Sequence, residues 1–242
     1  MFTDNHIELE TIESTNAYIL DLQDRNLFKE GLVVVAKHQT AGSGQRGNFW
    51  ESNKDENLLL SVVIEPRISV NQQFEISKLV ALSICDALYK LGLAPQIKWP
   101  NDILISKQKI AGLLIHNKFN KNIITHSIIG IGLNINQIMF NNYSPKATSL
   151  NLLLGKKFDI NQIKNYILQS LSNRIECFRI GKSNQKDYLE LLYLKDRKAL
   201  FESNNHSFQG VILGVDQQGA LLIECEDNTV EVFRHQEVKF VF

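Results

Sequence analysis

Three apolar runs of strand length most constrain what this chain can fold into: Gly31–Ala36, Leu58–Ile64 and Ile123–Leu133. Short, continuous apolar runs bounded by turn or polar residues are typical of buried β-strands. They are also much shorter than the roughly 20 apolar residues that a membrane-spanning helix needs. We therefore expect these runs to form strands in the core of a globular domain.

Three other segments show the pattern of helices that bury one face. Ala17–Leu22 follows Glu13–Asn16, whose hydroxyl and amide side chains suit a helix N-terminus. A second helix is expected over Phe74–Leu91, with Gly92 as its stop. A third is expected over Asp159–Arg179, where apolar residues recur at i, i+4.

A hairpin is expected between the second and third helices. Its strands are Ile103–Ser106 and Ile110–His116, with a tight turn at Lys107-Gln108. Pairing of these strands would bring Asp102 close to Lys109.

From about Leu194 the pattern changes to short strands separated by turn residues such as Asp216–Gly219. Five strands in about fifty residues predict a small β-barrel. The sequence therefore predicts an α+β main domain over residues 1–193 and a β domain over residues 194–242. The five expected strands are Lys198–Glu202, Phe208–Val215, Ala220–Glu226, Thr229–Arg234 and Val238–Phe242.

The composition excludes several classes of protein. Basic and acidic side chains both number 26, so no basic excess is present to neutralise nucleic-acid phosphates. The first residues show neither the basic nor the apolar region of a secretion signal. Three widely spaced cysteines are poor material for disulfides and fit a reducing cytoplasm. The six histidines show no zinc-binding spacing, so we expect no metal ligands on the protein.

A glycine-rich loop follows the first apolar run. Gly42, Gly44 and Gly47 allow backbone amides to approach an anion, and Arg46 adds a positive charge. The spacing matches the dinucleotide-binding G-x-G-x-x-G pattern, but a polar stretch with Trp50 follows instead of an apolar helix. A flexible surface loop without a ligand remains an alternative.

The second motif is Lys98-Trp99-Pro100-Asn101-Asp102, followed seven residues later by Lys109-Ile110-Ala111-Gly112. A neighbouring Asp102 would keep Lys109 charged and oriented. Such a lysine can hold a carboxylate and a phosphate together, which the activation of an acid by ATP requires. A surface ion pair is the alternative.

The third motif, Gly130-Ile131-Gly132-Leu133-Asn134, ends a strongly apolar strand. Glycine inside a strand marks either a bulge or a group that packs close to the backbone. A bulge without a ligand and a bound ligand ring both remain open.

In this order and spacing, the glycine-rich loop, KWPND, KIAG and GIGLN resemble the biotin–protein ligase family. Glu13–Asn16, Ala147–Leu150 and the terminal Gln236-Glu237-Val238 fit the same pattern. The resemblance covers essentially the whole chain, and KWPND with KIAG is its most specific part. It implies the short form of the family, without the N-terminal DNA-binding domain that some members carry.

The resemblance implies a fold and an activity. The fold is a class II aminoacyl-tRNA synthetase-like mixed sheet with helices, followed by an SH3-like barrel. The activity is formation of biotinoyl-5'-AMP from biotin and ATP, with Mg²⁺ screening the phosphates. Biotin then passes to a lysine of the biotin carboxyl carrier protein of acetyl-CoA carboxylase. The resemblance implies a cytoplasmic enzyme, and because members occur as monomers and dimers, a homodimer stays open.

The resemblance also implies site residues. Lys109 matches the catalytic lysine between biotin's carboxylate and the α-phosphate. Asp102 would help to position the adenylate and the incoming lysine, and Arg46 completes the expected catalytic set. The residues implied to bind biotin are Ser14, Thr15, Asn16, Gln39, Gly42, Gly112, Leu114, Gly130 and Gly132. Those implied to bind the nucleotide are Ser43, Gly44, Gln45, Arg46, Trp50, Lys98, Asn101, Lys109 and Asn134.

The chain departs from the family pattern in its glycine-rich loop. Members commonly read G-[RK]-G-R-x-G, whereas Ser43 and Gln45 stand at the two basic positions here. We hypothesise that the adjacent Arg46 substitutes for the missing cation. His116 stands where the family often has an acid, and it is assigned no role.

Two other functions remain to be tested. Lipoate ligases and octanoyl transferases share the core fold, but they carry an arginine-rich loop with a histidine close behind it, which is absent here. A biotin sensor without catalysis is disfavoured by the presence of Lys98, Asp102 and Lys109. Two roles of the β domain are left open: simple packing against the main domain, and a clamp on ATP or the carrier.

Overall fold

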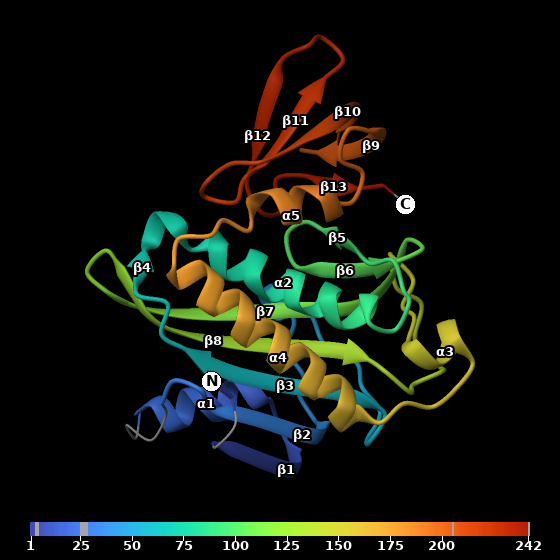
Figure 1. Ribbon diagram of the computed structural model, residues 1–242. Coiled ribbons are helices and arrows are strands. Elements are labelled where there is room, and N and C mark those ends of the chain that lie inside the picture. The colour runs from blue at the N-terminus through green and yellow to red at the C-terminus, as the bar shows by residue number, and fades with distance from the viewer. Residues whose placement is uncertain (3–4, 25–28, 205, 242) are drawn as a thin grey trace.

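The computed structural model describes residues 1–2, 5–24, 29–204 and 206–241, and the side chains of Gln23, Asp24 and Arg46 lie outside this description. The chain has two parts, a sheet covered by helices and a smaller all-β part next to it (Figure 1). The expected α+β class is therefore confirmed.

The first part is built on an eight-stranded mixed sheet. β1 and β2 pair in parallel, and the other described ladders are antiparallel. All eight residues of β3 are buried, which explains why that segment is apolar without alternation. In sheet order the strands are β1 (His6–Ile12), β2 (Val33–Gln39), β3 (Asn57–Ile64), β8 (Ile123–Asn134), β7 (Gln108–Asn120), β6 (Asp102–Ile105) and β5 (Gln96–Lys98), with β4 (Ile68–Ser69) paired to β8.

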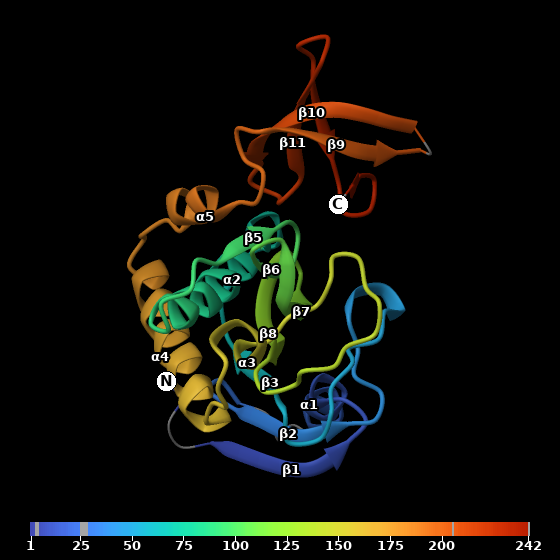
Figure 2. The same ribbon diagram turned by 90° about the vertical axis from the view of Figure 1, so that its right-hand side faces the viewer.

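The helices cover both faces of this sheet. α2 (Phe74–Tyr89) and α4 (Ile160–Arg179) pack on one face, and α1 (Thr15–Asp24) lies on the other (Figure 2). All three expected helices are confirmed, and the Asp159 carboxylate caps α4 by accepting from the Asn161 amide at 2.9 Å. The remaining short helices are α3 (Leu150–Leu154), α5 (Gln185–Leu191), η1 (Gln45–Gly47) and η2 (Val70–Gln72).

The expected hairpin is formed by β6 and β7. Its turn is Ser106-Lys107, with φ of 49° and 68°, the backbone twist that two-residue hairpins favour. The expected turn at Lys107-Gln108 is therefore wrong by one residue, because Gln108 already belongs to β7.

The second part is an antiparallel sheet of five strands. Their order is β12, β11, β10, β9, β13, and among the described residues no ladder joins β12 to β13. The expected SH3-like arrangement is thus present as an open sheet and not as a closed barrel. Its strands are β9 (Lys198–Ser203), β10 (His206–Val215), β11 (Leu221–Cys225), β12 (Val230–Phe233) and β13 (Lys239–Phe240); Phe242, the expected end of the last strand, lies outside the described residues.

The chain passes from the first part to the second around residue 194. The Tyr193 amide donates to the Ile97 carbonyl of the first sheet at 2.8 Å, and the Asp196 amide donates to the Ile212 carbonyl of the second at 3.0 Å. We therefore propose that the boundary between the two domains lies between residues 193 and 194.

The two parts are joined at the KWPND segment. The Trp99 indole nitrogen donates to the Gly219 carbonyl at 2.8 Å, and Trp99 is only 2% exposed. Gly219 has a φ of 90°, and a Cβ there would lie 2.3 Å from the Phe74 ring. Glycine is therefore needed at this contact for both its backbone and its size.

Candidate functional site

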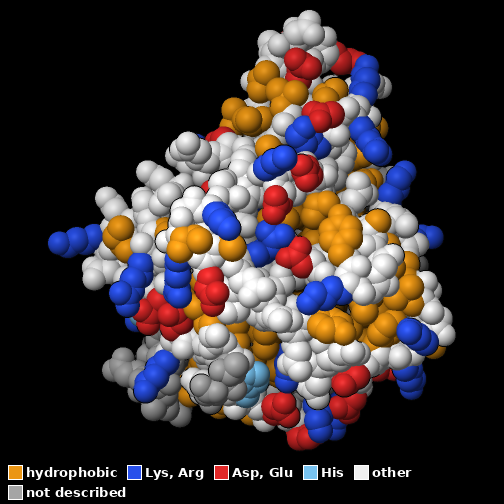
Figure 3. All heavy atoms as spheres, in the orientation of Figure 1, with side chains coloured by type: hydrophobic (Ala, Val, Ile, Leu, Met, Phe, Trp, Pro, Cys, Tyr) orange, Lys and Arg blue, Asp and Glu red, His pale blue; other side chains and the backbone are white. Residues whose placement is uncertain are grey.

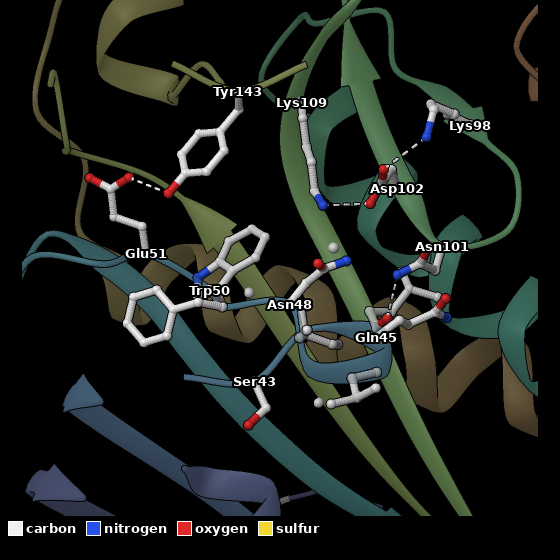
Figure 4. A pocket seen from close by; sticks show the side chains of 18 of the residues that line it. Ser43, Gln45, Asn48, Trp50, Glu51, Lys98, Asn101, Asp102, Lys109 and Tyr143 are labelled. Atoms are coloured by element: carbon white, nitrogen blue, oxygen red, sulfur yellow. Dashed lines mark hydrogen bonds and ion pairs between the residues drawn. The ribbon is translucent and has the colours of Figure 1, made fainter. Parts of the chain in front are cut away.

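A single cavity of about 890 Å³ gathers almost all of the residues that the sequence analysis selects (Figure 4). It is bounded by the start of α1, the glycine-rich loop, the KWPND segment, β7 and β8. Gly42 does not line it, and the Arg46 side chain lies outside the described residues. The selected residues that do line it are Ser14, Thr15, Asn16, Gln39, Ser43, Gly44, Gln45, Trp50, Lys98, Asn101, Asp102, Lys109, Gly112, Leu114, Gly130, Gly132 and Asn134.

One end of the cavity is a buried hydrogen-bond network. The Gln39 side-chain oxygen accepts from the Thr15 amide at 2.8 Å and from the Thr15 hydroxyl at 3.0 Å. The Ser61 hydroxyl lies 2.7 Å from Thr15 Oγ1 and 2.6 Å from Asn16 Oδ1. Asn16 in turn donates to the Leu114 carbonyl at 3.2 Å. These bonds fix the side chains at the start of α1 against the sheet.

Ser61 is a residue that the sequence analysis did not select. It is fully buried in β3 and holds two of the selected side chains in place. The signal available in the sequence is that Ser61 is the one polar residue within the apolar run Leu58–Ile64. A buried hydroxyl in such a run must find partners.

Glycines form the floor of the cavity. Gly112 and Gly132 face each other across β7 and β8, and a Cβ at Gly132 would lie 2.4 Å from the Trp50 ring. A Cβ at Gly130 would lie 2.7 Å from the Asn16 amide. The ladder between β7 and β8 is regular at these glycines, so the interpretation as a bulge is wrong. The groups that pack on the glycines here are Asn16 and Trp50.

A lysine–aspartate–lysine centre lies beside this floor. Lys109 Nζ lies 2.6 Å from Asp102 Oδ1, and Lys98 Nζ lies 3.2 Å from Asp102 Oδ2. The Asp102 side chain is only 10% exposed, so the interpretation as an ordinary surface ion pair is wrong. Two ammonium groups share one carboxylate, and the centre carries a net positive charge.

Two asparagines hold the surrounding backbone. Asn101 donates to the Leu113 carbonyl at 3.0 Å, which ties the KWPND segment to β7. Asn134 donates to the Thr148 carbonyl at 2.9 Å, and its side-chain oxygen is buried without a hydrogen-bond partner among the described residues. That acceptor can therefore bind a donor from a ligand.

The glycine-rich loop folds back on itself over the cavity. The Trp50 amide donates to the Gly42 carbonyl at 2.8 Å, and the Gly44 amide donates to the Asn48 carbonyl at 2.6 Å. A Cβ at Gly42 would lie 2.6 Å from the Trp50 carbonyl oxygen, so Gly42 shapes the loop instead of lining the cavity. Trp50 lies over Lys109, with 5.5 Å between Nζ and the ring centre.

The small β part supplies one wall of the same cavity. His235, Gln236, Val238, Lys239 and Phe240 line it, and Lys98 Nζ lies 5.3 Å from the centre of the Phe240 ring. The small β part therefore forms part of the site itself.

Comparisons with known proteins agree with this geometry. The family model described as "Biotin/lipoate A/B protein ligase family" matches residues 8–134, more than half of the 242 residues. The chain belongs to this family. The match ends at Asn134, so it covers the polar network, the glycine floor and the lysine–aspartate–lysine centre.

Individual members of the family match over most of the chain. The bifunctional ligase/repressor BirA of Bacillus subtilis is 29% identical over 242 residues, covering 93% of this chain and 70% of that protein. The biotin–[acetyl-CoA-carboxylase] ligase of Mycobacterium tuberculosis is 29% identical over 228 residues, covering 90% of this chain and 83% of that protein. The biotin protein ligase of Aquifex aeolicus, solved with biotin and ATP, matches with a TM-score of 0.80 at 22% identity, covering 99% of this chain and 100% of that one. The last comparison shows that both parts of the fold are shared.

The surface of this family member is mixed in charge. On the face in Figure 3 acidic and basic side chains are interspersed, as the equal totals of 26 lead one to expect. None of the described helices is both long and apolar enough to cross a membrane.

Proposed function

We propose that the chain is a biotin–protein ligase that forms biotinoyl-5'-AMP and then transfers biotin to a lysine of a carrier protein. The observation that carries the proposal is the position of Asp102, Lys98 and Lys109. They lie in one cavity with a buried polar network and with the Asn134 oxygen, which has no hydrogen-bond partner within the described part of the chain. Activating an acid with ATP needs positive charge between a site for the acid and a site for the nucleotide.

The polar network fits the ureido ring of biotin. That ring presents two N–H donors and one carbonyl acceptor, and Ser14, Thr15, Asn16 and Gln39 offer the matching hydroxyl and amide groups. The glycine floor and Leu114 suit a flat bicyclic ligand, since apolar walls with a few polar groups are typical of small-molecule sites. The binding residues proposed are Ser14, Thr15, Asn16, Gln39, Gly112, Leu114, Gly130 and Gly132, with Gly42 shaping the loop.

The other side of the cavity fits ATP. The buried Asn134 oxygen can accept from the adenine amino group, and Lys98 and Asn101, which line the same cavity, are proposed to contact the phosphates and ribose. Ser43, Gly44 and Gln45 present the loop to the phosphates, and we propose that Arg46 supplies its cation. Trp50 would separate the two ligands from water.

Mg²⁺ fits as a companion of the triphosphate. Among the described residues no group of three His, Cys, Asp or Glu side chains could hold a metal ion, and Mg²⁺ is commonly held by substrate phosphates and water. When bound, it would screen the negative charge of the phosphates.

In the first step a carboxylate oxygen of biotin attacks the α-phosphorus of ATP, and pyrophosphate leaves. Lys109 holds the two negatively charged groups together, and Asp102 keeps its ammonium group in place. In the second step a lysine amine of the carrier attacks the acyl carbon, AMP leaves, and the amine loses a proton. Positioning and charge stabilisation supply the catalysis.

The acceptor proposed is the biotin carboxyl carrier protein of acetyl-CoA carboxylase. Two relatives are named biotin–[acetyl-CoA-carboxylase] ligases, those of Mycobacterium tuberculosis and Paracoccus denitrificans. We place the reaction in the cytoplasm, where the free thiols of Cys85, Cys177 and Cys225 are stable.

The test is an ATP–pyrophosphate exchange assay with biotin, lipoate and octanoate offered in parallel. We expect exchange with biotin and none above background with the other two acids. Exchange with lipoate or octanoate but not biotin would identify the alternative activity within the family.

A further inference from the structure

Two loops meet at the edge of the cavity. The first, residues 48–53, leads into β3, and the second, residues 137–145, leads from β8 towards α3 (Figure 2). Glu51 of the first loop faces Tyr143 of the second (Figure 4). Glu51 Oε2 accepts from the Tyr143 hydroxyl at 2.7 Å, from the Asn141 side chain at 3.0 Å and from the Asn141 amide at 3.3 Å.

The bases of both loops are anchored to a buried side chain. Gln137 is fully buried, and its oxygen accepts from the Asn57 side chain at 2.6 Å and from the Asn53 amide at 3.0 Å. Its nitrogen donates to the Met139 carbonyl at 2.8 Å and to Glu51 Oε1 at 3.4 Å. Gln137 therefore fixes the bases of both loops, and Glu51 joins this buried anchor to the outer contact with Tyr143 and Asn141.

The contact at Glu51 is exposed enough to open. Tyr143 is 42% exposed, and the hydrogen bonds to Glu51 face solvent. Burial and the neighbouring carboxylate raise the pKa of Tyr143, so its hydroxyl stays protonated and donates. A carboxylate makes stronger hydrogen bonds with neutral donors than a neutral acceptor would.

Opening of this contact would change the wall of the cavity. Glu51 directly follows Trp50, whose ring covers Gly112 and Gly132. The second loop contributes Phe140 and Tyr143 to the lining of the same cavity. Both loops therefore carry part of the wall of the cavity that holds Lys109.

We propose that Glu51, with Tyr143 and Asn141, forms a clasp between the two loops that sets how long the acyl-adenylate is retained. The inference rests on the proposed function, in which a mixed anhydride must be kept from water until the acceptor lysine arrives. Glu51 and Tyr143 are positioning residues, because they act through Trp50 and the loop that carries it.

The experiment compares Glu51→Ala, Glu51→Gln and Tyr143→Phe with the unchanged chain. Biotin-dependent ATP–pyrophosphate exchange measures formation of the adenylate, and its release into solution without a carrier is measured separately. We expect Glu51→Ala and Tyr143→Phe to raise the ratio of release to formation about tenfold, the effect of losing roughly one charge-assisted hydrogen bond. Glu51→Gln keeps an acceptor and should show a smaller rise. The double variant should exceed neither single variant by much, because the two groups act as one unit.

Glu226→Gln and Tyr89→Phe are matched controls. Glu226 forms an exposed ion pair with Lys198 in the small β part, and Tyr89 is exposed at the end of α2. Both should leave the ratio unchanged. Equal melting temperatures of all variants will show that the fold is intact.

The possible failures are distinguishable. No biotin-dependent exchange by the unchanged chain would overturn the proposed function and this inference with it. Normal exchange with unchanged release in both Glu51→Ala and Tyr143→Phe would overturn the clasp alone.

Discussion

Among the single residues of the site, Asp102 has the largest effect on its charge. It contacts both Lys98 and Lys109 and is buried, so it holds two ammonium groups that would otherwise repel each other. One carboxylate against two lysines leaves one net positive charge for a carboxylate and a phosphate. The site therefore attracts anions.

Lys109→Ala should abolish the charge stabilisation that the lysine–aspartate–lysine centre provides. We expect biotin-dependent ATP–pyrophosphate exchange to fall by about two orders of magnitude or more, the scale of deleting a charge-stabilising group. Lys107→Ala, in the exposed hairpin turn, is the matched control and should be near normal. Near-normal exchange by Lys109→Ala would remove that lysine from the mechanism.

Arg46→Ala and Gln45→Ala separate the two candidates for the loop's phosphate contact. If Arg46 supplies the cation, Arg46→Ala should lower adenylate formation and increase leakage of biotinoyl-5'-AMP, because an arginine binds phosphate through a charged fork. Gln45→Ala should have a smaller effect. An effect of Gln45→Ala alone would show that the hypothesis about Arg46 is wrong.

Some site residues could be predicted from the sequence and others could not. The contact between Asp102 and Lys109 was predictable because both residues flank one local hairpin. Ser61 was missed because its partners, Thr15 and Asn16, are 46 and 45 residues away along the chain. A hydroxyl in an apolar strand indicates that a partner exists, but not which residue provides it.

Among the secondary-structure elements, β7 and β8 form one unit with the loop that carries Trp50. The indole fills the space over Gly112 and Gly132. A ligand ring placed on these glycines must therefore displace it.

Biotin should change the tryptophan fluorescence of the protein through Trp50. The chain has two tryptophans, and Trp99 is buried and hydrogen-bonded to Gly219, so it should be insensitive. Trp50→Phe should abolish the change in emission. A biotin-dependent change that persists in Trp50→Phe would show that the indole does not move.

Elements with a distinct apolar pattern or clear turn signals were predictable, and elements without them were not. α4 and β3 have the length and apolar pattern that local rules detect. β1 has a mixed pattern at the sheet edge, and β5 has three residues, so neither produces a distinct apolar run. Both are fixed by their neighbours in the sheet and not by their own residues.

In the whole molecule, the small β part completes the cavity that the first part begins. Its residues 235, 236 and 238–240 line the cavity, and the hydrogen bond from Trp99 to Gly219 holds it against the KWPND segment. Sequence patterns predicted its strands but not this contact, because 120 residues separate Trp99 from Gly219. The open sheet was not predictable either, since closure depends on whether the first and last strands pair.

Gly219→Ala should loosen the contact between the two parts. The added methyl group would meet the Phe74 ring, and the φ of 90° is unfavourable for alanine, so we expect a loss of about 2–3 kcal/mol in unfolding free energy. Gly181→Ala is the control, because Gly181 has a φ of 83° and open space around it, and should lose only about 1 kcal/mol. Equal losses in chemical denaturation would contradict the role given to the Phe74 contact.

Biotin transfer can be measured by intact mass spectrometry of a biotin carboxyl carrier domain after incubation with the protein, biotin, ATP and Mg²⁺. We expect the addition of one biotinyl group. The addition should be lost when the acceptor lysine of the carrier is changed to arginine, and also when the Lys109→Ala variant is used in place of the unchanged protein. A carrier that stays unmodified with biotin, or that is modified with lipoate instead, would contradict the proposed function.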